Sequence, residues 1–175
     1  PTGAAIAAAL ARATASWIGV RSATAFAPAA ARAVRAFASP ASAAACARNP
    51  VTGKRQLSLV STDQEIALGK EAAQQVTESI GRYPDPKVQS YVEGVGKRMA
   101  AKSERPNLPW TFTVLDDPTV NAFALPGGAV FVTRGILTHL NSEAELASVL
   151  GHEIGHITAR HSVQQLSKAQ LAQLG

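Results

Sequence analysis

The segment from Ser142 to His161 most constrains the fold, because it combines a helical pattern with a charged residue on the face that the pattern would bury. Ser142, with Glu145 three residues later, predicts a helix N-terminus closed by a capping box. Apolar residues then recur at helical spacing, namely Leu146, Val149, Leu150, Ile154 and Ile157. At about 100° per residue these side chains share one face, and Glu153 falls within it. A buried carboxylate is unfavourable unless it has a partner or a chemical role, so Glu153 requires a functional explanation.

His152, Glu153 and His156 form the motif H-E-x-x-H on this predicted helix. Residues four apart on a helix lie on the same face, so the two imidazoles can bind one metal ion together. Glu153 follows His152 directly, which places its carboxylate near the ion but turned away from direct ligation. Two histidine ligands beside a general base are typical of zinc hydrolases. We therefore predict one zinc ion per subunit, bound by His152 and His156, with Glu153 as the catalytic base.

Longer segments around the motif carry a family resemblance. The segments are Asn121-Ala-Phe-Ala-Leu-Pro-Gly-Gly-Ala-Val-Phe-Val-Thr-Arg-Gly135, residues 141–156, and residues 49–61 at the start of the expected domain. They resemble peptidase family M48, the HtpX- and BepA-like zinc metalloendopeptidases of bacterial envelopes and organelle membranes. The resemblance covers about residues 48 to 175. It implies a zincin-like metalloprotease domain acting on proteins or peptides, with misfolded envelope proteins as candidate substrates.

The resemblance also implies a third zinc ligand that this chain does not supply. In the family this ligand is a glutamate on a later helix, whereas no Asp or Glu follows Glu153 here. The chain also begins with Pro1 rather than Met. We therefore expect residues 48–175 to form the N-terminal part of a metallopeptidase domain, incomplete and inactive by itself.

Two other histidines are weaker candidates for the third ligand. We expect the motif helix to run past His161 toward Leu174, which would place His161 about 140° around the axis from His156, pointing elsewhere. His139 could approach only through a loop fold that the sequence does not predict. Arg160 lies four residues beyond His156 and is expected to contact the substrate or a nearby carboxylate, or else to form an exposed salt bridge.

The region before the motif predicts an α+β fold with a small three-stranded sheet. Two helices are expected, one over 62–80 with Thr62 and Glu65 as its capping box, and one opened by Asp85 and Pro86. Strands are expected at 110–115, 121–125 and 129–133.

Three packing expectations follow from the same patterns. Tyr91 and Met99 lie on the apolar face of the second helix and are expected in the core. Gly151 and Gly155 lie on the motif helix away from its apolar face, and glycine is unfavourable inside a helix. We therefore expect another backbone to pack closely against them.

The family resemblance implies that an edge strand near the motif helix receives the substrate as an added antiparallel strand. We assign this role to Asn121, Ala122 and Phe123. The alternative is that Phe123 belongs to the core, and both roles are compatible on alternate faces of the strand.

Residues 1–47 differ sharply in composition from the rest. Ala fills 22 of these 47 positions, and residues 1–62 hold seven Lys or Arg with no acidic residue. Residues 63–175 hold ten basic and twelve acidic residues, a net charge of −2. A nucleic-acid-binding domain would need a basic patch on its folded part, so we exclude nucleic acid as a partner.

Three interpretations of the leader remain open. It can be a lipoprotein signal ending at Cys46, an Arg-rich organelle transit peptide, or a disordered segment without tertiary contacts. The first predicts a periplasmic protein with possible membrane association through its N-terminus, and the second predicts a mitochondrion or another organelle. No run reaches the roughly 20 apolar residues of a membrane-spanning helix. Cys46 is the only cysteine, so no internal disulfide can form.

Two functions without catalysis compete with the protease. A chaperone-like binding module could keep the fold and bind unfolded proteins, but the intact H-E-x-x-H argues against it. A structural metal domain would need four protein ligands, and no cluster of cysteine or histidine residues supplies them.

Overall fold

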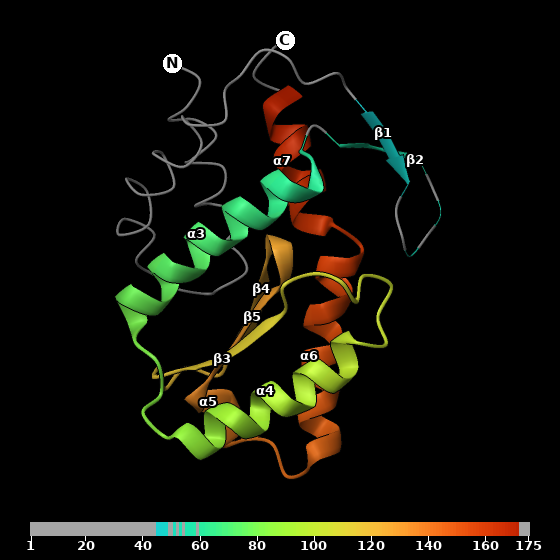
Figure 1. The fold of residues 1–175 in the computed structure, drawn as a ribbon. Helices are drawn as coiled ribbons and strands as arrows, with labels where there is room; N and C mark the ends of the chain where they lie inside the picture. Colours follow the sequence, from blue (N-terminus) through green and yellow to red (C-terminus); the bar gives the residue numbers. More distant parts are fainter. Residues whose placement is uncertain (1–44, 49–50, 52, 54, 59, 172–175) are drawn as a thin grey trace.

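The computed structural model describes residues 45–48, 51, 53, 55–58 and 60–171. Its first elements are β1 (Ala45–Arg48), β2 (Arg55–Ser58), α3 (Thr62–Ile80) and α4 (Pro86–Ala100). They are followed by β3 (Thr111–Leu115), β4 (Ala122–Leu125), the 3-10 turn η1 (Pro126–Gly128), β5 (Ala129–Thr133), α5 (Arg134–Leu137), α6 (Glu143–Thr158) and α7 (His161–Leu171). The predicted α+β class is confirmed (Figure 1). None of the described helices is long and apolar enough to cross a membrane.

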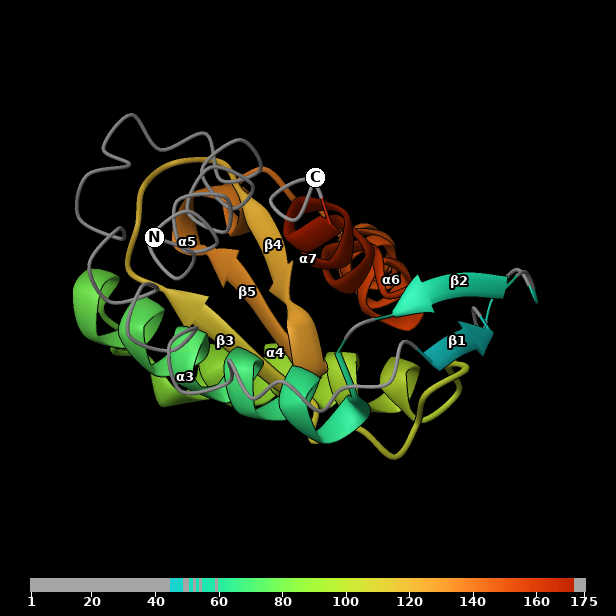
Figure 2. The same cartoon turned by 90° about the horizontal axis from the view of Figure 1, so that it is seen from above.

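The leader is described only at its end. Residues 1–44 lie outside the described part of the chain, whereas β1 pairs antiparallel with β2, with Cys46 opposite Leu57 (Figure 2). The expected absence of tertiary contacts is therefore wrong for Ala45, Cys46 and Ala47.

The main sheet has the strand order β3-β5-β4, so β5 is central and β4 is an edge strand. β5 pairs antiparallel with β4 across η1, with Phe123 opposite Phe131. β5 pairs in parallel with β3, with Phe112 opposite Val130. The strand patterns alone did not indicate this parallel pairing, because each strand is too short to record its partner's direction.

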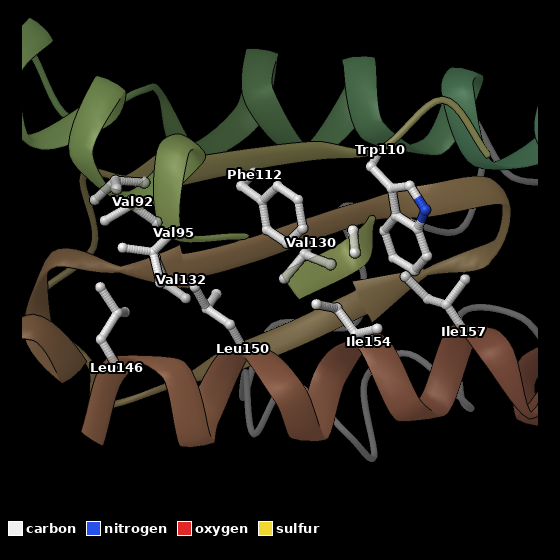
Figure 3. Packing of buried hydrophobic residues seen from close by; sticks show 12 residues of the cluster. Val92, Val95, Trp110, Phe112, Val130, Val132, Leu146, Leu150, Ile154 and Ile157 are labelled. Carbon is white, nitrogen blue, oxygen red and sulfur yellow. The ribbon is translucent and has the colours of Figure 1, made fainter. Parts of the chain in front are cut away.

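Each face of the sheet has its own helices. One face packs against α4 and α6, and this cluster of buried residues, called the apolar core below, consists of Val92, Val95, Ala100, Trp110, Phe112, Val114, Val130, Val132, Leu146, Leu150, Ile154 and Ile157. Figure 3 shows the side chains of α6 pointing from the helix toward the strands. The opposite face packs against α3 through Leu115, Phe123, Leu125, Ala129 and Phe131. The predicted inward face of the motif helix is confirmed for Leu146, Leu150, Ile154 and Ile157, whereas Val149 is only partly buried.

Helix α3 lies directly on the turn between β4 and β5. A side chain at Gly69 of α3 would collide with the backbone carbonyl of Pro126, and Gly127 adopts a φ of +82° against Ile66. Two backbones can approach this closely only where side chains are absent. The contact fixes one end of the sheet against α3.

Helix starts were predicted with mixed success. Asp85 caps α4 as expected, accepting hydrogen bonds from the backbone N–H groups of Lys87 and Val88. The cap of α3 is wrong by one residue, because Ser61 and Gln64 form the reciprocal capping box. This shift releases Glu65 from the cap, and its side chain is buried.

Of the two α4 residues expected in the core, one lies there and the other does not. Met99 packs against the apolar core. Tyr91 is 50% exposed, and its hydroxyl donates a hydrogen bond to Glu143. Its core assignment is wrong, because a polar partner on α6 holds the phenol at the surface.

Candidate active site

Helix α6 carries the H-E-x-x-H motif and is anchored by the apolar core. Ser142 accepts a hydrogen bond from the backbone N–H of Glu145, as predicted. The Glu145 carboxylate does not complete the box and accepts from the backbone of Asn141 at 2.7 Å. Among the described residues, no backbone makes the contact expected at the two glycines. Within that part of the chain, a Cβ at Gly151 would meet the Met99 side chain, and one at Gly155 would meet no atom within 4 Å.

The structure brings His152 and His156 together. Their Nε2 atoms are 3.0 Å apart, and their rings meet edge to face at 89° with centroids 4.6 Å apart. His152 is exposed and His156 is partly buried. Burial lowers the pKa of His156, and the nearby His152 and His161 lower it further. Two nitrogen atoms that converge in this way are suited to one metal ion.

Glu153 is buried beside the histidine pair, with 6% of its surface exposed. Its Oε2 atom has no hydrogen-bond partner among the described residues. Burial raises the pKa of the Glu153 carboxyl, whereas the charge of His152 acts in the opposite direction. A buried carboxylate oxygen without a protein partner needs a water molecule or a cation nearby, which fits a metal site.

The described residues do not complete such a site. Within this part of the chain, no three His, Cys, Asp or Glu side chains are placed to hold a metal ion together. The His139 ring contacts the preceding helical turn, with Nδ1 2.9 Å from the carbonyl oxygen of Gly135.

The motif helix ends much earlier than predicted. It stops at Thr158, and Arg160 adopts a left-handed backbone with a φ of 56° before α7 begins at His161. The turn brings His161 back to the site, and its Nδ1 lies 2.8 Å from Nδ1 of His156. The expectation that His161 points away is therefore wrong, because it assumed a straight helix.

Arg160 is buried with 8% of its surface exposed, so the expected exposed salt bridge is wrong, whereas the expected contact with a carboxylate is made with Glu65. Its guanidinium donates to Oε2 of Glu65 and to the carbonyl oxygen of Val60. Arg105 also donates to Glu65, at 2.8 and 3.1 Å, and to the carbonyl oxygen of Ile157 at 3.2 Å. Glu65, Arg105 and Arg160 are called the charged cluster below.

Sequence reasoning missed the role of Glu65, although a signal was present. Glu65, Gly69 and Val76 are the buried residues of α3, and their spacing of four and seven places them on one helical face. A glutamate on an inward face signals a buried ion pair, as it signals a functional role at Glu153.

The strand expected to bind substrate lies beside α6. Ala122 and Ala124 of β4 pack against the apolar core that includes α6. The backbone of Asn121 is tied to Thr133, whose N–H donates to the Asn121 carbonyl oxygen at 3.0 Å. The Phe123 ring is buried and stacks on Phe131 with centroids 5.2 Å apart. The Phe123 side chain thus belongs to the core, as the alternative expectation had it.

Comparison with known proteins agrees with this geometry. The sequence profile described as peptidase family M48 matches residues 86–175, which include the sheet and the whole of α6. The chain is 40% identical over 121 residues to the mitochondrial metalloendopeptidase OMA1 of Schizosaccharomyces pombe, covering 67% of this chain and 36% of that protein. It is 33% identical over 121 residues to the beta-barrel assembly-enhancing protease of Yersinia pestis, covering 69% of this chain and 25% of that protein.

The alignment with a third relative covers fewer residues. The mitochondrial metalloendopeptidase OMA1 of Arabidopsis thaliana is 44% identical over 72 residues, which cover 41% of this chain and 15% of that protein. The chain thus spans only a minor part of each relative's length. The profile match extends across the motif helix and the strands that support it, and the chain belongs to peptidase family M48.

Proposed function

We propose that the full-length protein is a zinc-dependent endopeptidase that hydrolyses peptide bonds of protein substrates, with envelope protein quality control as its role. The observation that carries this proposal is the pair of Nε2 atoms on His152 and His156, 3.0 Å apart, beside the Glu153 Oε2 atom, which has no hydrogen-bond partner among the described residues. Membership of a peptidase family and relatives named as metalloendopeptidases support it.

In this proposal His152 and His156 hold one zinc ion through their Nε2 atoms. The third ligand in this proposal is the glutamate on a later helix that the family resemblance implies. A zinc ion held there supplies a Lewis acid that polarises a peptide carbonyl and makes water more acidic. His152 and His156 fix the position of that ion at the exposed side of α6, next to Glu153.

Glu153 is the proposed general base. Its carboxylate accepts the proton of the attacking water and then delivers that proton to the leaving amine. Burial raises the pKa of this carboxyl, and a base with a pKa closer to the working pH returns its proton more readily. The residue therefore suits both steps.

The proposed substrate lies along the free side of β4. An extended peptide can add to an edge strand through backbone hydrogen bonds, and β4 is such a strand next to α6. The segment of Asn121, Ala122 and Phe123 would lie against the peptide, although both backbone groups of Asn121 bond Thr133 and the Phe123 ring is committed to the core. Recognition by backbone is tolerant of sequence, which suits an enzyme that removes misfolded proteins.

The proposed location is the bacterial envelope, in the periplasm or on a membrane, with a mitochondrion or other organelle as the alternative. The relatives include proteins named for both mitochondria and β-barrel assembly. Membrane attachment through residues 1–47, with lipid on Cys46, is part of this proposal. Replacing Cys46 with Ser in cells fed a labelled fatty acid tests it, since a lipoprotein would lose both the label and the membrane fraction.

The test of the catalytic proposal separates the base from the ligand. In the full-length protein, Glu153→Gln keeps the size of the side chain but not its basicity, so cleavage of an unstructured polypeptide should fall by about 10²- to 10⁴-fold. Bound zinc, measured by atomic absorption, should remain. His152→Ala should lose zinc and cleavage together.

Glu143→Gln provides the matched control, because Glu143 is an exposed carboxylate at the opposite end of the same helix. Its cleavage rate should equal that of the wild type. Near-normal cleavage by Glu153→Gln with zinc still bound would remove the protease mechanism and favour a chaperone-like binding module.

A further inference from the structure

His156 uses both of its ring nitrogens in contacts with other histidines. Its Nε2 faces Nε2 of His152 at 3.0 Å, and its Nδ1 faces Nδ1 of His161 at 2.8 Å. The two nitrogens lie on different edges of an imidazole, so their lone pairs point in divergent directions. A metal ion held between the Nε2 atoms of His152 and His156 lies at one edge of the His156 ring. A group that contacts Nδ1 at the other edge therefore cannot bind the same ion. His161 therefore lies behind the candidate ligand rather than among the ligands.

The short contact between the two Nδ1 atoms requires one proton, because one nitrogen must donate and the other accept. A metal ligand binds through a nitrogen that carries no proton, so His156 must hold its proton on Nδ1 when Nε2 is the ligand. His161 is then the acceptor, with its own proton on Nε2. The His161 residue is exposed to solvent.

The position of His161 depends on the turn at Arg160. On a straight α6, His161 would lie about 140° around the axis from His156. The left-handed Arg160 redirects the chain, and its buried guanidinium is held by Glu65 and by the Val60 carbonyl. Arg105 ties the same carboxylate to the last turn of α6 through the carbonyl oxygen of Ile157. The charged cluster therefore holds the acceptor in place.

We propose that His161 is a positioning residue, which accepts the Nδ1–H of His156 and so keeps Nε2 of His156 directed at the metal in the correct tautomer. The proposal rests on the zinc site proposed above. Partners of this kind orient metal-binding histidines and raise their basicity, and their removal lowers metal affinity by about 10- to 100-fold. Most such partners are carboxylates or backbone carbonyls, whereas here a neutral imidazole performs the role.

Zinc affinity provides the main test. Competition with a chromophoric chelator measures zinc binding by the full-length protein and its variants. His161→Phe keeps a ring but has no acceptor, and we expect its affinity to fall by about 10- to 100-fold. His161→Asn places an amide oxygen close to the position of Nδ1, and we expect it to recover most of the lost affinity. His139→Phe, at an exposed histidine outside the site, should bind zinc like the wild type.

Nitrogen NMR of the imidazoles in the unaltered, metal-free protein gives a second readout. We expect the proton of His156 on Nδ1, and we expect His161→Phe to shift it toward Nε2. Affinity of His161→Phe within twofold of the wild type, or a wild-type His156 protonated on Nε2, would overturn the inference. If the wild type binds no zinc, the proposed function fails, while the tautomer measurement still decides the contact between the two rings.

Discussion

The apolar core and the charged cluster both hold helix α6, but they fix different properties of it. The apolar core covers the inward side of the helix through Leu146, Leu150, Ile154 and Ile157. Burial of this kind depends on area and has little direction, so it determines which face of α6 points inward. The charged cluster acts at the end of the helix through directional hydrogen bonds. It determines where the chain turns and therefore where His161 lies.

The largest expected effect on stability comes from removing the centre of the charged cluster. Glu65 is 1% exposed and forms salt bridges with Arg105 and Arg160. Glu65→Gln keeps the volume but leaves two buried guanidinium groups without a counter-charge. Breaking a buried ion pair on one side destabilises proteins by about 3–5 kcal/mol. Urea denaturation of the metal-free protein measures this, and we expect the same loss for Glu65→Ala.

Glu78→Gln is the control for that experiment, since Glu78 is exposed on the same helix. Its free energy of unfolding should change by less than about 0.5 kcal/mol. If Glu65→Gln is equally mild, the charged cluster does not hold the turn, and the contrast with the apolar core disappears.

A slightly smaller effect is expected in the apolar core, and it should depend on volume rather than on charge. Leu150 is fully buried, so Leu150→Ala should lower the free energy of unfolding by about 2–5 kcal/mol. Leu150→Met conserves volume and should cost less than about 1.5 kcal/mol. Equal losses for Met and Ala at this position would mean that shape, not buried area, governs the core. Urea titration of the wild type and of both variants gives the free energies of unfolding.

The smallest effect is expected for an ion pair at the surface, which isolates the influence of burial. Lys97 and Glu93 are 2.6 Å apart on α4, with side chains 58% and 41% exposed. Lys97→Ala should cost about 0.3–0.5 kcal/mol. Unfolding in 1 M sodium chloride should abolish this loss, because salt screens exposed charges, and should leave most of the Glu65→Gln loss. A salt-insensitive loss at Lys97 would contradict this account.

The sequence was informative wherever a structural feature depends on neighbours along the chain. Asp85 before Pro86 opens α4, and the spacing of Leu150 and Ile154 identifies the inward face of α6. The pairing of His152 with His156 follows from helical geometry alone. These features could be predicted because helix caps and helical faces are local.

The break after Thr158 could not be predicted in the same way. No glycine or proline lies between His156 and Leu171, so local preference favours a continuous helix. The left-handed Arg160 persists because its side chain reaches Glu65, a residue 95 positions earlier. The core assignment of Tyr91 was wrong for a related reason, since its hydrogen-bond partner Glu143 is 52 positions away. Contacts at such separations leave no periodic pattern in the sequence.

The separation of the charged residues along the chain has a consequence for the order of folding. Glu65 lies 40 positions from Arg105 and 95 from Arg160, so their contacts close large loops. Such contacts form after local helices, since loop-closure entropy must be overcome before they contribute. During synthesis from the N-terminus, α3 and the sheet leave the ribosome before Arg160 does. The turn that carries His161 is therefore completed after the sheet, and a nascent chain that already contains His152 and Glu153 still lacks this turn.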